Sequence, residues 1–193
     1  MANCNLLSLS SIPYECESSL GGIKEIAVAD YSVIFPDGSS VEDALELDED
    51  KVVTQIKKVT TTKPFKVFQF RKNTGNMETT ASVSDATGLP LFTTNVTTVF
   101  GRMDSQKRLA LQALALGQLC VLVKDANNKI WIVGTDDYAS MSASTAATGT
   151  AKADANSYSL TLTAESVEYP YEVSAAVWTE VCEYPDTTTP SGE

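Results

Sequence analysis

The chain has 193 residues, of which 43% are apolar and 20% are charged, and it contains no histidine. A chain of this size can fold as one domain with a substantial core, and the lack of imidazole excludes every catalytic triad that needs it. Fourteen basic and 25 acidic residues give a net charge of −11. This balance argues against a protein that binds nucleic acid through Lys and Arg.

The sequence carries no pattern typical of membrane insertion, cofactor binding or catalysis. It has no run of 18 apolar residues and no charged, apolar leader, so we expect no membrane span and maturation in the cytosol. Phosphate-binding loops, dinucleotide fingerprints and hydrolase motifs are absent. The cysteines lack metal-binding spacing and are expected to be small buried residues: Cys4, Cys16, Cys120 and Cys182. We therefore expect no cofactor, no metal and no enzymatic activity.

The first third of the chain is predicted to hold a polar arm, three strands and an acidic run. Residues 1–20 are rich in Ser and Asn and are interpreted as a docking arm. Apolar, β-branched stretches predict strands over 22–35, 52–59 and 65–72. Residues 41–50 are strongly acidic, which indicates either a solvated loop or short helix, or a counter-charge for a partner surface.

A long polar segment, residues 73–88, separates two predicted strands. It contains Thr, Ser, Asn, Gly and Ala with almost nothing to bury. From Leu91 to Phe100 the sequence alternates strictly, which places on one face Phe92, Thr94, Val96, Thr98 and Phe100. The pattern predicts a long hairpin whose tip extends beyond the core, and a loop of that length is usually functional or disordered.

The sequence predicts a helix over Ser105–Leu116, with Asp104 as its N-cap and Gly117 as its end. Its expected buried stripe follows helical spacing and comprises Leu109, Ala110, Ala113, Leu114 and Leu116. Lys107 and Arg108 lie in the first turn, where the helix dipole disfavours positive charge. Either a nearby carboxylate, in this or another subunit, offsets that charge, or both side chains point to water.

The remaining sequence again favours strands. Leu119–Val123 and Ile130–Val133 predict a hairpin, residues 139–151 a linker of small residues, and the alternation over 157–164 a half-buried strand. A last strand is predicted from Tyr171, Val173, Ala175, Val177 and Val181.

We therefore expect a mainly β fold: a β-sandwich or barrel with one flanking helix and a long protruding hairpin. Residues 21–183 would form the β-rich domain and residues 184–193 a flexible tail.

Charge is segregated along the chain. Residues 1–64 carry a net charge of −6, residues 65–118 carry +3 and residues 119–193 carry −8. Such a subunit can bind copies of itself head to tail, acid onto base. Candidate intersubunit contacts are Lys107 and Arg108 on the basic side and, on the acidic side, Glu42, Asp43, Glu46, Asp48, Glu49 and Asp50.

The succession of predicted elements resembles the tail tube proteins of long-tailed bacteriophages and the related tube proteins of contractile injection machines. The residues that carry the likeness are Arg102-Met103-Asp104 before the helix, the hairpin Val121–Gly134, and the stretch Thr148–Thr163. They cover the second half of the chain, while the first half matches only in the order of its elements.

The resemblance implies a virion protein, assembled in the host cytoplasm, whose hexameric rings stack into a tube with one inner barrel of strands. Its implied partners are itself, other tail proteins and passing DNA, which is not specifically bound. An inter-ring loop is assigned to Asn73, Thr74, Gly75, Asn76, Met77, Glu78, Asp85 and Gly88. An acidic lining suits such a conduit, because it repels phosphate over the roughly 8 Å that salt leaves unscreened.

Two other classes fit the same sequence. One is a tail terminator or head–tail joining protein, which would close into a ring without polymerising. The other is a monomeric β-sandwich that binds carbohydrate or protein by aromatic stacking, for which the candidates are Trp131, Trp178, Tyr158, Tyr169 and Tyr171.

Overall fold

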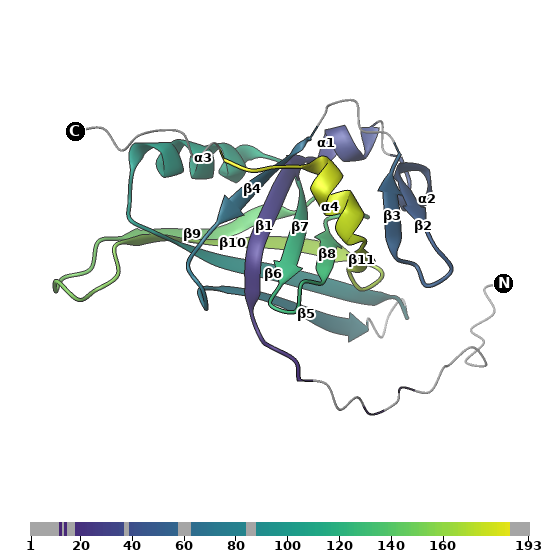
Figure 1. Ribbon diagram of the computed structural model, residues 1–193, viewed down its shortest axis with the longest axis horizontal. Helices are drawn as coiled ribbons and strands as arrows, with labels where there is room; N and C mark the ends of the chain where they lie inside the picture. The colour runs from purple at the N-terminus through teal and green to yellow at the C-terminus, as the bar shows by residue number, and fades with distance from the viewer. Residues whose placement is uncertain are drawn as a thin grey trace.

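The structure is a computed structural model that describes residues 12, 14, 18–36, 39–57, 63–83 and 88–185. Of these residues 48% lie in strands and 18% in helices. The strands form an eight-stranded and a four-stranded sheet whose strands run across one another (Figure 1). The prediction of a mainly β fold of the sandwich or barrel type is confirmed.

The larger sheet contains most of the short strands. Its spatial order is β12 (Cys182–Glu183), β4 (Phe65–Gln69), β1 (Ile23–Asp30), β7 (Leu119–Asp125), β8 (Ile130–Val133), β11 (Tyr171–Val173), β3 (Val53–Ile56) and β2 (Leu45–Leu47). Neighbours are antiparallel except β12 with β4 and β11 with β3, which are parallel. The predicted hairpin of Leu119–Val123 with Ile130–Val133 is confirmed as β7 and β8.

The central strand β7 is buried on both of its faces. Cys120 and Leu122 belong to one apolar cluster and Val121 and Val123 to another, because successive side chains point to opposite sides of a strand. This explains why its sequence is a continuous apolar run rather than an alternating one. The eight-stranded sheet is therefore the middle layer of the molecule.

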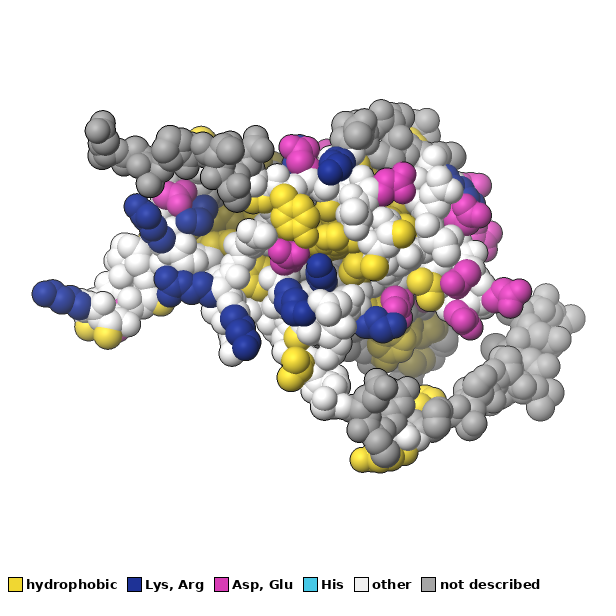
Figure 2. All heavy atoms as spheres, viewed as in Figure 1, with side chains coloured by type: hydrophobic (Ala, Val, Ile, Leu, Met, Phe, Trp, Pro, Cys, Tyr) yellow, Lys and Arg dark blue, Asp and Glu magenta, His cyan; other side chains and the backbone are white. Residues whose placement is uncertain are grey.

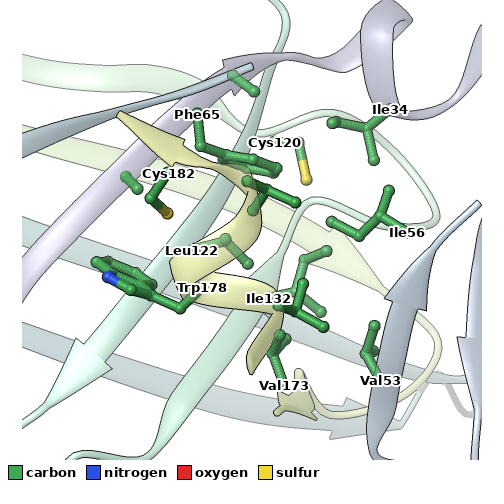
Figure 3. Packing of buried hydrophobic residues seen from close by; sticks show 14 of the residues in the cluster. Ile34, Val53, Ile56, Phe65, Cys120, Leu122, Ile132, Val173, Trp178 and Cys182 are labelled. Atoms are coloured by element: carbon green, nitrogen blue, oxygen red, sulfur yellow. The ribbon is translucent and has the colours of Figure 1, made fainter. Parts of the chain in front are cut away.

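Short helices cover one face of this sheet: α1 (Tyr31–Ile34), α2 (Val41–Ala44) and α4 (Ala175–Val181). Ile34, Trp178 and Val181 pack with Phe65 and Leu122 in this cluster (Figure 3). Cys120 and Cys182 are free and buried here, and burial raises the pKa of both thiols, that of Cys182 to about 12.

The four-stranded sheet covers the other face. Its order is β5 (Gly75–Val83), β6 (Pro90–Gly101), β10 (Ser157–Ser166) and β9 (Ser140–Ala147), with every neighbour antiparallel. The inner side chains of β6 and β10 pack against β1 and β7. The alternation predicted over 91–100 and 157–164 is thus confirmed as β6 and β10.

The helix α3 (Ser105–Leu116) has the predicted bounds. The Asp104 carboxylate accepts a hydrogen bond from the Lys107 backbone N–H at 2.8 Å, as expected of an N-cap. The predicted stripe was wrong in part: Leu111 and Leu114 are buried, whereas Leu109 is 58% and Leu116 is 88% exposed. Leu and Ala occur on both sides of this helix, so spacing alone did not decide which side packs.

Three other predictions were wrong in their secondary structure. Residues 75–83, expected within a loop, form β5, and residues 140–147, expected within a linker, form β9. Residues 175–181, expected in a strand, form α4. The single expected helix is therefore joined by three short ones in the part of the chain that the structure describes.

Both ends of the described chain are tied to the sheets. The Leu20 backbone N–H donates to the Asn127 side chain at 2.9 Å. The Tyr184 hydroxyl donates to Glu25 and accepts from the Trp178 indole, each at 3.1 Å. Most of the predicted arm (1–20) and residues 186–193 of the predicted tail lie outside the described residues, although Ile12 and Tyr14 are exposed.

Candidate assembly surfaces

Within the described residues, the four-stranded sheet ends in two long strands that pair with no further strand on their outer side, although α3 contacts β9. β5, nine residues, and β9, eight residues, occupy its two edges. Proteins usually protect such edges with Pro, Lys or bulges, yet these strands contain no Pro or Lys, and Glu78 is their one charged residue. A single register shift interrupts β9, opposite Thr161 and Leu162. Both edges therefore present backbone groups that can pair with another strand.

The hydrogen bonding of β5 defines which of its backbone groups are free. The Val99 N–H donates to the Thr74 carbonyl at 3.0 Å. Since bonded and non-bonded pairs alternate along an antiparallel ladder, Asn76, Glu78 and Thr80 direct their backbone groups toward β6. The N–H groups of Met77, Thr79 and Ala81 consequently point away from β6, toward the open edge.

No helix or strand of the described residues covers the outer face of the four-stranded sheet, and this face is nearly neutral. Its hydroxyls bond to one another: Thr163 Oγ1 donates to Asn95 at 2.7 Å, and the Thr97 and Thr161 hydroxyls lie 3.2 Å apart. The four strands contain only Glu78 and Glu165 as charged residues, and neither Lys nor Arg. A surface of this kind has no cation with which to hold phosphate.

Half of the residues assigned to an inter-ring loop fall in this edge. Gly75, Asn76, Met77 and Glu78 lie in β5, paired with Thr98, Thr97, Val96 and Asn95 of β6. Asn73 and Thr74 form the turn before it, and Gly88 lies just before β6. Asp85 lies outside the described residues. The structure thus places half of these residues in a sheet edge.

The predicted charge contacts have different surroundings. Lys107 is already paired, because its ammonium lies 2.5 Å from the Asp104 carboxylate, and this hydrogen bond lowers the pKa of Asp104. Arg108 is exposed. Of the two alternatives for Lys107, the structure shows the first: a nearby carboxylate offsets its charge, and that carboxylate belongs to the same subunit.

The predicted acidic residues lie together on α2, β2 and the turn that leads to β3. Asp43 accepts from the Ser40 hydroxyl at 2.9 Å, and Asp48 accepts from the backbone N–H groups of Asp50 and Val52. Glu42, Glu46, Glu49 and Asp50 are exposed, and no salt bridge within the described residues reaches them.

A cationic pocket was missed by the sequence analysis. Arg71 and Arg102 line a depression of about 430 Å³ together with the end of the β9–β10 hairpin, where the one carboxylate, Asp154, accepts from the backbone N–H groups of Thr150 and Ala151. Arg102 has a left-handed backbone, φ 62°, and its N–H donates to the Asn156 carbonyl at 2.7 Å. The two arginines lie on either side of the whole β5–β6 hairpin in the sequence, so only the fold brings them together.

An aromatic cleft of about 560 Å³ lies at the other end of β6. Phe92, Trp131, Tyr169 and Tyr171 line it, and the Phe92 and Tyr169 rings lie 4.4 Å apart. Glu168 also lines it, and hydrogen bonds from Tyr171 and Lys51 lower the pKa of this carboxyl. Of the predicted stacking residues, Trp131, Tyr169 and Tyr171 meet here, whereas Trp178 is buried and Tyr158 packs in the core.

No helix in the described part of the chain is long and apolar enough to cross a membrane. Within the same residues, no three Asp, Glu or Cys side chains come together as metal ligands would. Comparison of the chain with protein-family models, with curated proteins and with solved structures gives no match. Function must therefore be argued from the surfaces described above.

Proposed function

We propose that this chain is a structural protein of a bacteriophage tail whose copies join side by side into rings, and whose rings stack into a tube that conducts DNA. The observation that carries this proposal is the four-stranded sheet, which has two open edges and one uncovered face as far as the structure describes the chain. In an isolated chain, the edge strands β5 and β9 of that sheet have no partner strand among the described residues. A second copy can complete the sheet at each edge.

The direction of the strands suits such a ring. Because all neighbours are antiparallel and the sheet has four strands, β5 and β9 at its two edges run in opposite directions. When copies are related by rotation about an axis near the strand direction, β9 of one copy meets β5 of the next as an antiparallel pair. The alternation then continues around any closed ring, and no edge remains exposed.

The uncovered face suits the lining of a conduit. A ring of six copies, as the resemblance to tail tube proteins implies, would form a barrel of about 24 strands, roughly 35–50 Å across at the backbone. Its lining would consist largely of Ser, Thr, Asn and Ala, with Leu91 and Val99 as apolar residues and with Glu78 and Glu165 as the charged residues of the strands. DNA would find no cation to bind there, so passage would be passive and without chemistry.

The experiment is electron microscopy of the purified chain. We expect rings and hollow filaments. Closed rings that never stack would instead favour the tail terminator or joining-ring class.

A proline in the open edge tests the lateral contact directly. Ala81→Pro removes an N–H that points away from β6, so the fold is retained while pairing with a neighbouring strand is blocked. We expect dispersed monomers with unchanged circular dichroism. Ala81→Val, which keeps the N–H, is the matched control and should still form rings; rings formed by the proline variant would contradict this contact.

A second candidate is a binding module for carbohydrate or protein, favoured by the aromatic cleft that Trp131, Tyr169 and Tyr171 line. Flat apolar faces of sugar rings or side chains stack on such residues. Solitary particles in the same micrographs would favour this candidate over the tube.

A further inference from the structure

Positive charge gathers at one end of the molecule. Figure 2 shows Lys and Arg side chains concentrated over the end that carries α3 and the β9–β10 hairpin. Arg71, Lys72 and Arg102 are exposed there, and no salt bridge among the described residues uses them. This end therefore holds cations that have no partner within the described part of the subunit.

The backbone of Arg102 is left-handed, as are those of Lys51, Lys63, Asn73 and Asn128. A left-handed conformation is uncommon for residues other than Gly and Asn and costs on the order of 1 kcal/mol. At φ 62° a glycine would remove that strain. The chain instead places a guanidinium there, beside Arg71 and above the end of β6.

Negative charge gathers at the opposite end. Figure 2 shows Asp and Glu side chains over α2, β2 and β3, across the longest axis from α3 (Figure 1). Two lysines also lie here: Lys51 is paired with Glu168 at 3.1 Å, and the Lys57 ammonium donates to the Glu42 backbone carbonyl at 3.1 Å. The exposed carboxylates of Glu46, Glu49 and Asp50 consequently have no cationic partner among the described residues.

The length of β6 gives the distance between the basic end and the acidic end. Asp50 lines the same cleft as Pro90 and Phe92 at the start of β6, whereas Arg71 and Arg102 line the pocket beside Gly101 at its end. Twelve residues of β6 span about 36 Å at the rise of an extended strand. Charge is thus separated along the strands of the four-stranded sheet, at right angles to the direction in which its edges would pair.

We propose that copies of this chain also contact one another end to end, with Glu46, Glu49 and Asp50 of one copy against the Arg71–Arg102 pocket of the next. Because the lateral rings are themselves proposed, this assigns the second of two contacts: edge pairing closes a ring, and end pairing stacks one ring on another. Lys107 plays no part in it, since Asp104 already neutralises its charge.

The two contacts differ in their response to salt. Main-chain pairing at the edges depends on hydrogen bonds and is little affected by ions, whereas exposed ion pairs weaken as the screening length falls from about 8 Å at physiological salt to about 3 Å at 1 M. Wild-type filaments should therefore separate into intact rings at high salt. Filaments that persist unchanged at 1 M salt would overturn the end-to-end assignment.

Charge reversal gives a sharper test. One variant carries Glu46→Lys, Glu49→Lys and Asp50→Lys, and the other carries Arg71→Glu, Lys72→Glu and Arg102→Glu. Each would have like charges at both ends and should form rings whose stacking is weakened roughly tenfold or more. Mixed in equal amounts, the two variants present complementary ends again and should restore stacks in alternation. Glu180→Lys, an exposed reversal on α4, is the control and should stack as wild type.

Sedimentation of the mixture separates the two proposals. If the variants pair with each other but no rings form, the ring function fails and the end contact stands. If rings form but the variants do not pair, the end contact fails and the ring function stands. Either variant stacking alone as well as the wild type would also overturn the end contact.

Discussion

The two sheets of this protein differ in how much of their faces is covered and in the length of their edge strands. The eight-stranded sheet is covered by helices on one side and by the second sheet on the other, and its edge strands, β12 and β2, have only two and three residues. The four-stranded sheet has one face that no described element covers, and its edge strands are nine and eight residues long. The first sheet holds the core of the fold, and the second is the one that we propose to contact a further copy.

This division assigns stability and assembly to different residues. Apolar side chains fill both faces of β7, while the outer face of β6 and β10 carries Thr and Ser that satisfy one another. Substitutions in the first region should unfold the chain. Substitutions on the outer face of the second should leave the fold intact and change only association.

The largest effect is expected in the middle of the eight-stranded sheet. Leu122 is 0% exposed and lies within the cluster shown in Figure 3. Leu122→Ala should lower the free energy of unfolding by about 2–5 kcal/mol, because it removes buried surface and leaves a cavity. Urea denaturation, at a concentration low enough to prevent assembly, measures this loss.

The matched control is Leu91→Ala on the outer side of β6, where the leucine is only half-buried. Its cost should stay below about 1 kcal/mol, since little apolar area returns to water. Equal costs at Leu122 and Leu91 would contradict the contrast between the sheets.

A smaller but still large effect is expected where the chain passes from one sheet to the other. Gly134 follows β8 with φ 82°, and a Cβ there would lie 2.8 Å from the Ala139 nitrogen and 2.9 Å from the Leu119 carbonyl oxygen. Those two residues exchange hydrogen bonds of 2.7 and 2.9 Å at this crossing. Gly134→Ala should therefore cost roughly 2–4 kcal/mol.

Gly88 provides the comparison for that substitution. It also has a positive φ, 65°, but nothing lies within 4 Å of the position that a Cβ would take. Gly88→Ala should cost only about 1 kcal/mol, the strain of the backbone alone. If thermal unfolding showed the same loss of stability for both variants, crowding around the added Cβ would not explain the cost at Gly134.

The contrast between the sheets also explains what the sequence could and could not predict. β6 and β10 each have one buried and one solvent-facing side. Their apolar and polar residues therefore alternate, and both strands were predicted from the sequence. β5 and β9 are exposed on most positions, so their Ser, Thr, Gly and Ala residues give no contrast of burial. Edge strands built this way look like loops in a sequence.

The error at α4 has another cause. Ala175, Val177 and Val181 allow a strand pattern, but Val177, Trp178 and Val181 are the residues that are buried, at helical spacing. Ser174 caps this helix, with its hydroxyl accepting from the Ala176 N–H. That cap followed by the Trp was the signal that could have identified the helix.

The candidate surfaces were predictable only where they are local in sequence. The acidic residues of α2, β2 and the following turn are consecutive enough to stand out, and the structure places them together. The Arg71–Arg102 pocket requires the β6 strand to return beside the turn that precedes β5. Long-range pairing of this kind is set by tertiary packing, which composition and spacing do not encode.

The smallest predicted effect has the opposite sign and sharpens the comparison within the second sheet. Thr98 is 0% exposed on the inner side of β6, opposite Leu160, and its hydroxyl has no hydrogen-bond partner among the described residues. Thr98→Val keeps the shape and removes the unpaired group, so urea denaturation should show a gain of about 1 kcal/mol.

Thr94→Val, four residues earlier on the same strand, is the counterpart on the inner side, because the Thr94 hydroxyl lies 2.9 Å from that of Thr79 on β5 and is satisfied by it. Its loss should cost about 1 kcal/mol. A cost of the same size at Thr98 would mean that its hydroxyl is paired in solution. The inner side of this sheet would then depend on polar contacts as its outer side does, and burial alone would not distinguish the two.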